Sequence, residues 1–68
     1  MTTVDARGYS CPEPVIMTRK ALMSKEVEYT VLVDNTASRE NVTRYAEHQC
    51  YKVTVAEADG VYTLTLKK

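Results

Sequence analysis

Aromatic platforms and excess charge are both missing from this sequence. There is no Trp and no Phe, and the five Tyr residues are scattered, so no surface for stacking nucleic-acid bases can be recognised. Nine basic and nine acidic residues give a formal net charge of zero, whereas proteins that bind nucleic acid through its phosphates usually carry a basic excess. We therefore expect no direct contact with nucleic acid.

Long apolar runs and clusters of metal ligands are missing as well. No apolar run approaches the length that spans a bilayer, and residues Met1 to Asp5 lack the charged and then apolar pattern of a signal peptide. We expect a cytoplasmic protein without membrane contact, whose two Cys residues are thiols rather than a disulfide. One His and two distant Cys do not make a zinc site, and we expect neither a metal nor a cofactor.

The length of 68 residues predicts a single domain over residues 1–68. A chain this short buries only about 60% of the surface that its unfolded form exposes. A deep, enclosed active site is therefore not expected, and any chemistry should take place at the surface.

Four strands are predicted, and three of them show a clean alternation of apolar and polar residues. They cover about Thr3–Ala6, Val27–Val33, Tyr51–Ala56 and Tyr62–Lys67. The pair Asp59-Gly60 is typical of a hairpin turn between the last two strands. One face of each strand is expected to be buried, and Val27 belongs to that face of the second strand.

Two segments with helical periodicity, Pro12–Met23 and Ser38–His48, lie between these strands. The order βαβαββ predicts two parallel strand–helix–strand units and one antiparallel strand. Strands that are covered on both faces read as continuous apolar runs, whereas these strands alternate. The predicted fold class is α/β (α+β), a two-layer sandwich with a four-stranded mixed sheet and two helices on one face. In the first helix, the expected buried residues are Val15, Ile16, Leu22 and Met23.

Two loops are expected to meet at the carboxyl ends of the parallel strands, where α/β proteins gather their functional groups. They are Arg7–Pro14 and Asp34–Arg39. Cys11 lies in the first loop at the start of a helix, and helix N-termini favour the reactive thiolate. Asp5 and Glu13 are expected to oppose this effect, and Arg7 to assist it.

Two caps are compatible with the start of the first helix. Either Pro12 takes the first helical position and Cys11 is the N-cap, or Ser10 and Glu13 form a capping box with Cys11 one position inside. Both arrangements hold Cys11 near the positive end of the helix dipole.

Cys50 precedes the third predicted strand and so lies at the opposite edge of the sheet. The second helix separates the two edges by about 15 Å at 1.5 Å per residue, and a disulfide needs Cα atoms within about 7 Å. We expect no Cys11–Cys50 disulfide within one chain, and we expect Cys50 to pack at a helix end. A neighbouring thiol would discharge a persulfide on Cys11 by forming a disulfide and releasing sulfide. A Cys11 without such a neighbour can accept a sulfur atom and keep it for a partner.

The run from Asp5 to Ile16 contains Asp-x-x-Gly-x-x-Cys-Pro-x-Pro, which resembles the Cys-Pro-x-Pro signature of the TusA/SirA/YedF sulfur-carrier family. The resemblance covers essentially the whole chain, and segments 33–35 and 40–46 are most similar to the YedF-like branch. It implies that Cys11 carries a persulfide, received from a sulfur donor such as a cysteine desulfurase and passed to an acceptor protein. The outlet is tRNA thiolation in the TusA branch, and a link to selenium metabolism is suggested for the YedF branch. Cys50 stands where that branch commonly has Gly.

A supporting partner surface is expected around Cys11, formed by Arg7, Gly8, Pro12, Glu13, Pro14, Asp34, Asn35 and Arg39. Gly8 is predicted to form the tight turn that aims the loop. Asp34 and Asn35 either cap the second helix or shape the partner surface. Two functions stay open: a sulfurtransferase-type carrier acting through Cys11, and a non-catalytic interaction or regulatory module in which the two prolines only shape a docking surface.

Overall fold

The computed structural model describes residues 2–10 and 12–68. In chain order its elements are β1 (Thr2–Asp5), α1 (Glu13–Leu22), β2 (Glu28–Val33), α2 (Thr36–His48), β3 (Lys52–Ala58) and β4 (Val61–Lys67). The predicted order βαβαββ is confirmed, and each predicted boundary lies within two residues of the observed one.

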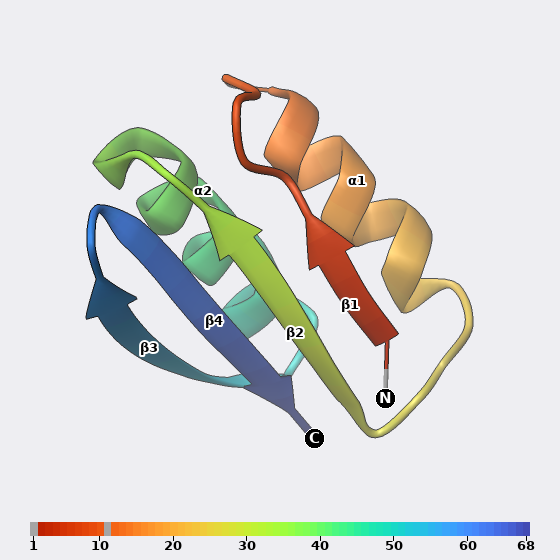
Figure 1. The fold of residues 1–68 in the computed structure, drawn as a ribbon. Helices are drawn as coiled ribbons and strands as arrows, with labels where there is room; N and C mark the ends of the chain where they lie inside the picture. Colours follow the sequence, from red (N-terminus) through yellow and green to blue (C-terminus); the bar gives the residue numbers. More distant parts are fainter. Residues whose placement is uncertain (1, 11) are drawn as a thin grey trace.

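The four strands form one mixed sheet in the order β1-β2-β4-β3. β1 and β2 are parallel, whereas β4 pairs antiparallel with both β2 and β3. The C-terminal strand is therefore inserted between β2 and β3. Both helices lie behind the sheet in Figure 1, which confirms the predicted two-layer arrangement.

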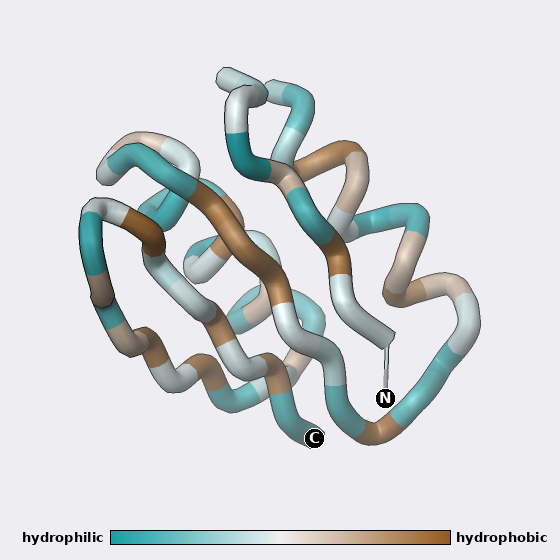
Figure 2. Tube along the Cα trace, viewed as in Figure 1, coloured by the Kyte–Doolittle hydropathy of each residue, from teal (hydrophilic) through white to brown (hydrophobic). Residues whose placement is uncertain are grey.

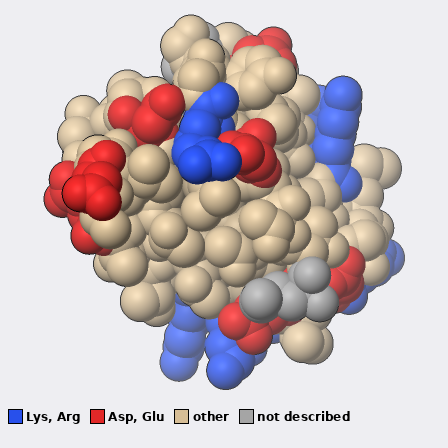
Figure 3. Space-filling view, in the orientation of Figure 1, with Lys and Arg blue, Asp and Glu red and all other residues tan. Residues whose placement is uncertain are grey.

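The other face of the sheet carries polar but mostly uncharged side chains. Thr3, Thr30, Thr65 and Thr54 are in register across all four strands. Figure 3 shows this face, on which the charged side chains gather toward the margin and the middle is largely free of them. The alternation in the sequence thus separates a buried face from an open one, as expected for strands that are covered on one side only.

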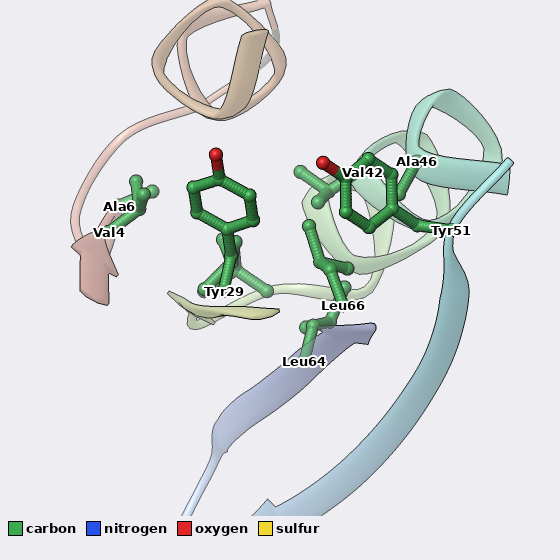
Figure 4. Close-up of a cluster of buried hydrophobic side chains, with 10 residues drawn as sticks. Val4, Ala6, Tyr29, Val42, Ala46, Tyr51, Leu64 and Leu66 are labelled. Carbon is green, nitrogen blue, oxygen red and sulfur yellow. The ribbon is translucent and has the colours of Figure 1, made fainter. Parts of the chain in front are cut away.

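The core lies between the sheet and the helices, and the two central strands provide most of it. Its buried members are Val4, Ala6, Tyr29, Val31, Val33, Val42, Ala46, Tyr51, Leu64 and Leu66. In Figure 2 the hydrophobic colour follows β2 and recurs along β4. Figure 4 shows Leu66 of β4 pointing toward Val42 of α2, whereas Tyr29 of β2 points toward α1. The rings of Tyr29 and Tyr51 meet edge to face with their centroids 5.9 Å apart.

The two buried tyrosines also fix the segment that joins α1 to β2. The Tyr29 hydroxyl lies 2.8 Å from Ser24 Oγ and accepts the Glu26 N–H at 2.8 Å. The Tyr51 hydroxyl donates to the Glu26 carbonyl at 3.3 Å, and burial raises the pKa of Tyr51. Because both phenol groups have polar partners, their burial does not leave an unpaired hydroxyl in the core.

Two predictions about burial are wrong in detail. Val27, expected in the core, is 73% exposed because β2 begins one residue later and α1 has already ended at Leu22. In α1 the fully buried residues are Pro14 and Thr18, whereas Met23 is 76% exposed beyond the helix end. Thr18 is tolerated there because its hydroxyl donates to the Pro14 carbonyl at 2.9 Å.

No helix in the two described stretches is long and apolar enough to cross a membrane.

Two valines of one predicted strand provide a matched test of this core. Val31→Ala removes two buried methyl groups, worth about 0.8 kcal/mol each, and leaves a cavity, so we expect a loss of about 2 kcal/mol in the free energy of unfolding. Val27→Ala should change it by less than about 0.5 kcal/mol because this side chain is already exposed. Urea denaturation measures both values, and equal losses would contradict the observed packing.

Candidate functional site

The predicted meeting of two loops at one edge of the sheet is confirmed. β1 and β2 run in parallel with Asp5 opposite Leu32, so both strands end at the same edge. There the Gly8 N–H donates to Asp34 Oδ2 at 2.8 Å, which joins the loop after β1 to the loop after β2. A longer contact of 3.5 Å runs from Asn35 Nδ2 to the Tyr9 carbonyl.

Asn35 connects this edge to α2. It is the N-cap of the helix, and its Oδ1 accepts the Ser38 N–H at 2.7 Å. The same side chain reaches the Tyr9 carbonyl through its amide nitrogen. Of the two roles considered for Asp34 and Asn35, capping is therefore confirmed for Asn35, while Asp34 holds the Gly8 turn through a charge-assisted hydrogen bond.

Gly8 forms the predicted tight turn. Its φ of +82° lies in the left-handed region, and a Cβ built on it would meet nothing within 4 Å. The requirement for glycine therefore comes from the backbone conformation and not from lack of space. The Tyr9 N–H donates to the Ala6 carbonyl at 3.3 Å and closes the turn.

The start of α1 differs from both predicted caps. Pro12 is the N-cap, and no side-chain hydrogen bond from a described residue caps the helix. The Pro12 carbonyl accepts the Ile16 N–H at 3.1 Å, and the Glu13 N–H donates to the Ser10 backbone carbonyl at 2.9 Å. The helix thus begins one residue later than expected, with Pro14 in its first turn, where a missing N–H costs nothing.

Cys11, the predicted sulfur-carrying residue, lies outside the described residues. Its chain neighbours Ser10 and Pro12 are both exposed, and so is Glu13. Pro14, by contrast, is fully buried, so its side chain supports the loop from the core. The residues that flank Cys11 are therefore exposed, and Pro14 anchors the segment to the core.

Arg7 and Asp5 are paired with each other. Arg7 Nε and one terminal nitrogen lie 2.9 and 2.8 Å from the two carboxylate oxygens, and the Arg7 N–H adds a bond of 3.2 Å. The side-chain hydrogen bonds from Arg7 lower the pKa of Asp5 to about 2, and the same bonds raise the pKa of Arg7. Asp5 was expected to oppose the Cys11 thiolate and Arg7 to assist it. Because the two charges form one ion pair with no net charge, their effects on the loop largely cancel.

Arg39 is oriented away from the contact between Gly8 and Asp34. Its guanidinium carbon lies 5.0 Å from the centre of the Tyr62 ring, and one nitrogen is 3.7 Å from Glu40 Oε1. These contacts hold the side chain on the β3–β4 side of α2. Arg39 therefore belongs to a different surface from Arg7 and Gly8.

Tyr9 is the site residue that sequence reasoning missed. Its side chain is 49% exposed one position before Ser10, and its carbonyl faces Asn35. A large aromatic residue in a loop, outside any alternating or helical segment, has no core position to fill. That placement was the signal in the sequence, because exposed aromatic side chains are frequent contact residues in protein interfaces.

Cys50 lies at the opposite end of the sheet, as predicted, but it is exposed and does not pack. It follows Gln49, the C-cap of α2, and has a φ of +68°, a conformation that suits glycine. A hollow of about 450 Å³ at this end is lined by residues that include Leu22, Lys25 and Tyr51. Within residues 2–10 and 12–68, no group of three or more His, Cys, Asp or Glu side chains could hold a metal ion.

The fold and this loop define a small α+β domain that presents a cysteine loop at the carboxyl edge of its parallel strands. Residues 2–68 match the family model described as sulfurtransferase TusA, and the chain belongs to this family. It is 35% identical over 71 residues to a protein of Methanocaldococcus jannaschii with the name "Putative sulfur carrier protein", covering all of this chain and 95% of that protein. It is also similar to the crystal structure of a SirA-like protein from Desulfitobacterium hafniense, with a TM-score of 0.89, 44% identity, and coverage of 98% of this chain and 96% of that one.

The ion pair beside the loop predicts a specific titration. Arg7→Gln should raise the pKa of Asp5 from about 2 toward its ordinary value of 3.8, because the main stabilising hydrogen bonds of the carboxylate are lost. Since the folded pKa is the lower one, any stability from this pair is present above about pH 4 and is lost as the pH falls toward 2. Carboxyl NMR shifts measure the pKa. Arg19→Gln, in the last turn of α1, is the matched control and should leave it unchanged.

Proposed function

We propose that the chain is a sulfur carrier in which Cys11 accepts a persulfide sulfur and relays it to an acceptor protein. The observation that carries this proposal is the position of Cys11 between exposed Ser10 and exposed Pro12, one residue before the N-cap of α1, in a member of the TusA family. A cysteine beside a helix N-terminus has a favoured thiolate, which is the nucleophile in sulfur transfer.

The transfer is an exchange between sulfur atoms. The Cys11 thiolate attacks the outer sulfur of the donor persulfide, the S–S bond of the donor breaks, and its electron pair leaves with the donor cysteine as a thiolate. A new S–S bond on Cys11 makes the carrier persulfide. Delivery repeats the step with an acceptor nucleophile, and neither step needs an added oxidant or reductant.

The donor in this proposal is a cysteine desulfurase or another protein persulfide, met at the surface around the loop. The exposed residues that are available for contact are Arg7, Tyr9, Ser10, Glu13 and Asp34. Because sulfur must be both received and released, the interface should be small and transient. We place the reaction in the cytoplasm, where thiols remain reduced. Membership of the YedF-like branch rests on segments 33–35 and 40–46 alone, and these residues do not separate sulfur from selenium.

Intact-mass measurement after incubation with a cysteine desulfurase and cysteine tests the proposal. The wild-type chain should gain one sulfur atom that a thiol reductant removes. Cys11→Ser should gain none. Cys50→Ser is the matched control, because it removes the other exposed thiol at the far end of the sheet and should still gain the sulfur atom.

A second function is tested by the same experiment. If neither a desulfurase nor inorganic polysulfide loads Cys11, the carrier proposal is wrong, and the non-catalytic interaction or regulatory module becomes the better explanation. Loading that depends on Cys50 instead of Cys11 would also contradict the assignment. Slow alkylation of Cys11 at neutral pH would argue against an exposed thiolate.

Two glycines with almost equal backbone angles separate the role of the loop from its stability. Gly8 and Gly60 have φ values of +82° and +77°, and neither position has atoms within 4 Å of an added Cβ. Each Gly→Ala variant should therefore lose about 1 kcal/mol of stability through the same backbone strain. Only Gly8→Ala should also slow sulfur loading, because it changes the turn that precedes Cys11. Loading rates and urea denaturation of both variants measure this, and equal loading would contradict it.

A further inference from the structure

β3 presents an unpaired edge. The strand order places it at one side of the sheet, where its partner within the described chain is β4 alone. β1 occupies the other edge but has four residues, whereas β3 has seven. A strand of this length offers a row of backbone donors and acceptors to another strand. Figure 1 shows β3 on the outer side of the sheet, away from β1 and α1.

The hairpin geometry tells which backbone groups point outward. Asp59 and Gly60 form a two-residue turn with φ values of 52° and 77°, and Ala58 lies opposite Val61. The pair that closes such a turn is hydrogen-bonded, and hydrogen-bonded pairs then alternate along the ladder. The backbone N–H and C=O groups of Ala58, Ala56 and Thr54 are thus hydrogen-bonded to β4. Those at the free edge belong to Val53, Val55 and Glu57.

A groove runs beside this edge, between β3 and α2. Its volume is about 320 Å³, and it is lined by Arg39, Glu40, Thr43, Arg44, Glu47 and Val55. Val55 is 41% exposed, which makes it one of the few large apolar side chains on the surface. The groove therefore combines an apolar residue on the strand with charged residues on the helix.

The pattern of these residues is self-complementary. A two-fold axis perpendicular to the sheet at Val55 sets β3 antiparallel to β3 of a second copy. The outward backbone groups of Val55 then pair with those of Val55 in the second copy, and Val53 lies opposite Glu57. The same axis sets α2 antiparallel to α2 of the second copy. Arg39 and Glu47 lie four residues before and after Thr43, which lines the same groove as Val55, so in this arrangement each lies level with the opposite charge of the other copy.

We propose that the β3 edge is the docking site for a second copy of this chain, which extends the sheet across two protomers. The outward groups of all three edge residues find partners, and the exposed parts of the two Val55 side chains cover each other. The occupant is a second copy because two charges of this groove, Arg39 and Glu47, complement each other under the symmetry that the strand pairing imposes. The proposal does not depend on sulfur transfer, and it leaves the Cys11 loops accessible, because β1 lies at the opposite edge.

Sedimentation equilibrium over a range of concentrations tests this interface. The wild-type mass should rise from one chain toward two. Val55→Lys places a charge on the pairing edge and should raise the dissociation constant of the dimer by at least about tenfold. Val27→Lys is the matched control, because Val27 is equally apolar and more exposed but lies before β2, and it should leave the constant unchanged.

Charge reversal identifies the contacts. Glu47→Arg should weaken the dimer by about tenfold, because the two-fold axis turns two ion pairs into two repulsions. Arg39→Glu should do the same, and the double variant should return to within about threefold of the wild type. This recovery separates the proposed pairing from loss of the contacts that Arg39 makes with Tyr62 and Glu40.

Amide hydrogen exchange gives an independent reading. Val53, Val55 and Glu57 should become protected as the concentration rises, whereas Thr54 should be protected throughout. A chain that stays monomeric at every concentration overturns the proposal. A dimer that is insensitive to Val55→Lys, or edge amides that become protected only when a different protein is added, overturns it as well.

Discussion

The parallel pairing of β1 with β2 is the constraint on which the site depends. Parallel strands need a crossover between them, and here α1 provides it, so the chain must leave β1 at the same edge at which it later leaves β2. The Cys11 loop and the Asp34–Asn35 loop are therefore neighbours although more than twenty residues separate them. A hairpin connection would have put them at opposite ends.

The contact between these loops links the stability of α2 to the shape of the Cys11 loop. Asn35 satisfies the free Ser38 N–H at the start of α2 and also faces the Tyr9 carbonyl, while the neighbouring Asp34 holds Gly8. The loop is thus fastened by groups whose own positions are set by a helix of thirteen residues. Rigid support of the residues that flank Cys11 does not require an enclosed pocket, which a domain of this size can hardly form.

The sequence was sufficient for the element order, the two layers and the meeting of the loops, because these follow from alternation, helical periodicity and the direction of parallel strands. It was not sufficient where burial or side-chain orientation depends on contacts between residues that are distant in the chain. Val27 and Tyr29 share one predicted face, but only Tyr29 has a helix and the Tyr51 ring above it. The insertion of β4 beside β2, the turning of Arg39 toward Tyr62 and the mutual pairing of Arg7 with Asp5 depend on contacts that no local pattern contains.

The two cysteines occupy electrostatically opposite positions. Cys11 directly precedes the N-cap of α1, at the positive end of that helix dipole, which favours an anion. Cys50 directly follows the C-cap of α2, at the negative end of that helix dipole. Exposure alone would make Cys50 an equal candidate, since its thiol is open to solvent. The direction of the adjoining helix therefore differs between the two cysteines, and it supports the choice of Cys11 in the proposed sulfur transfer.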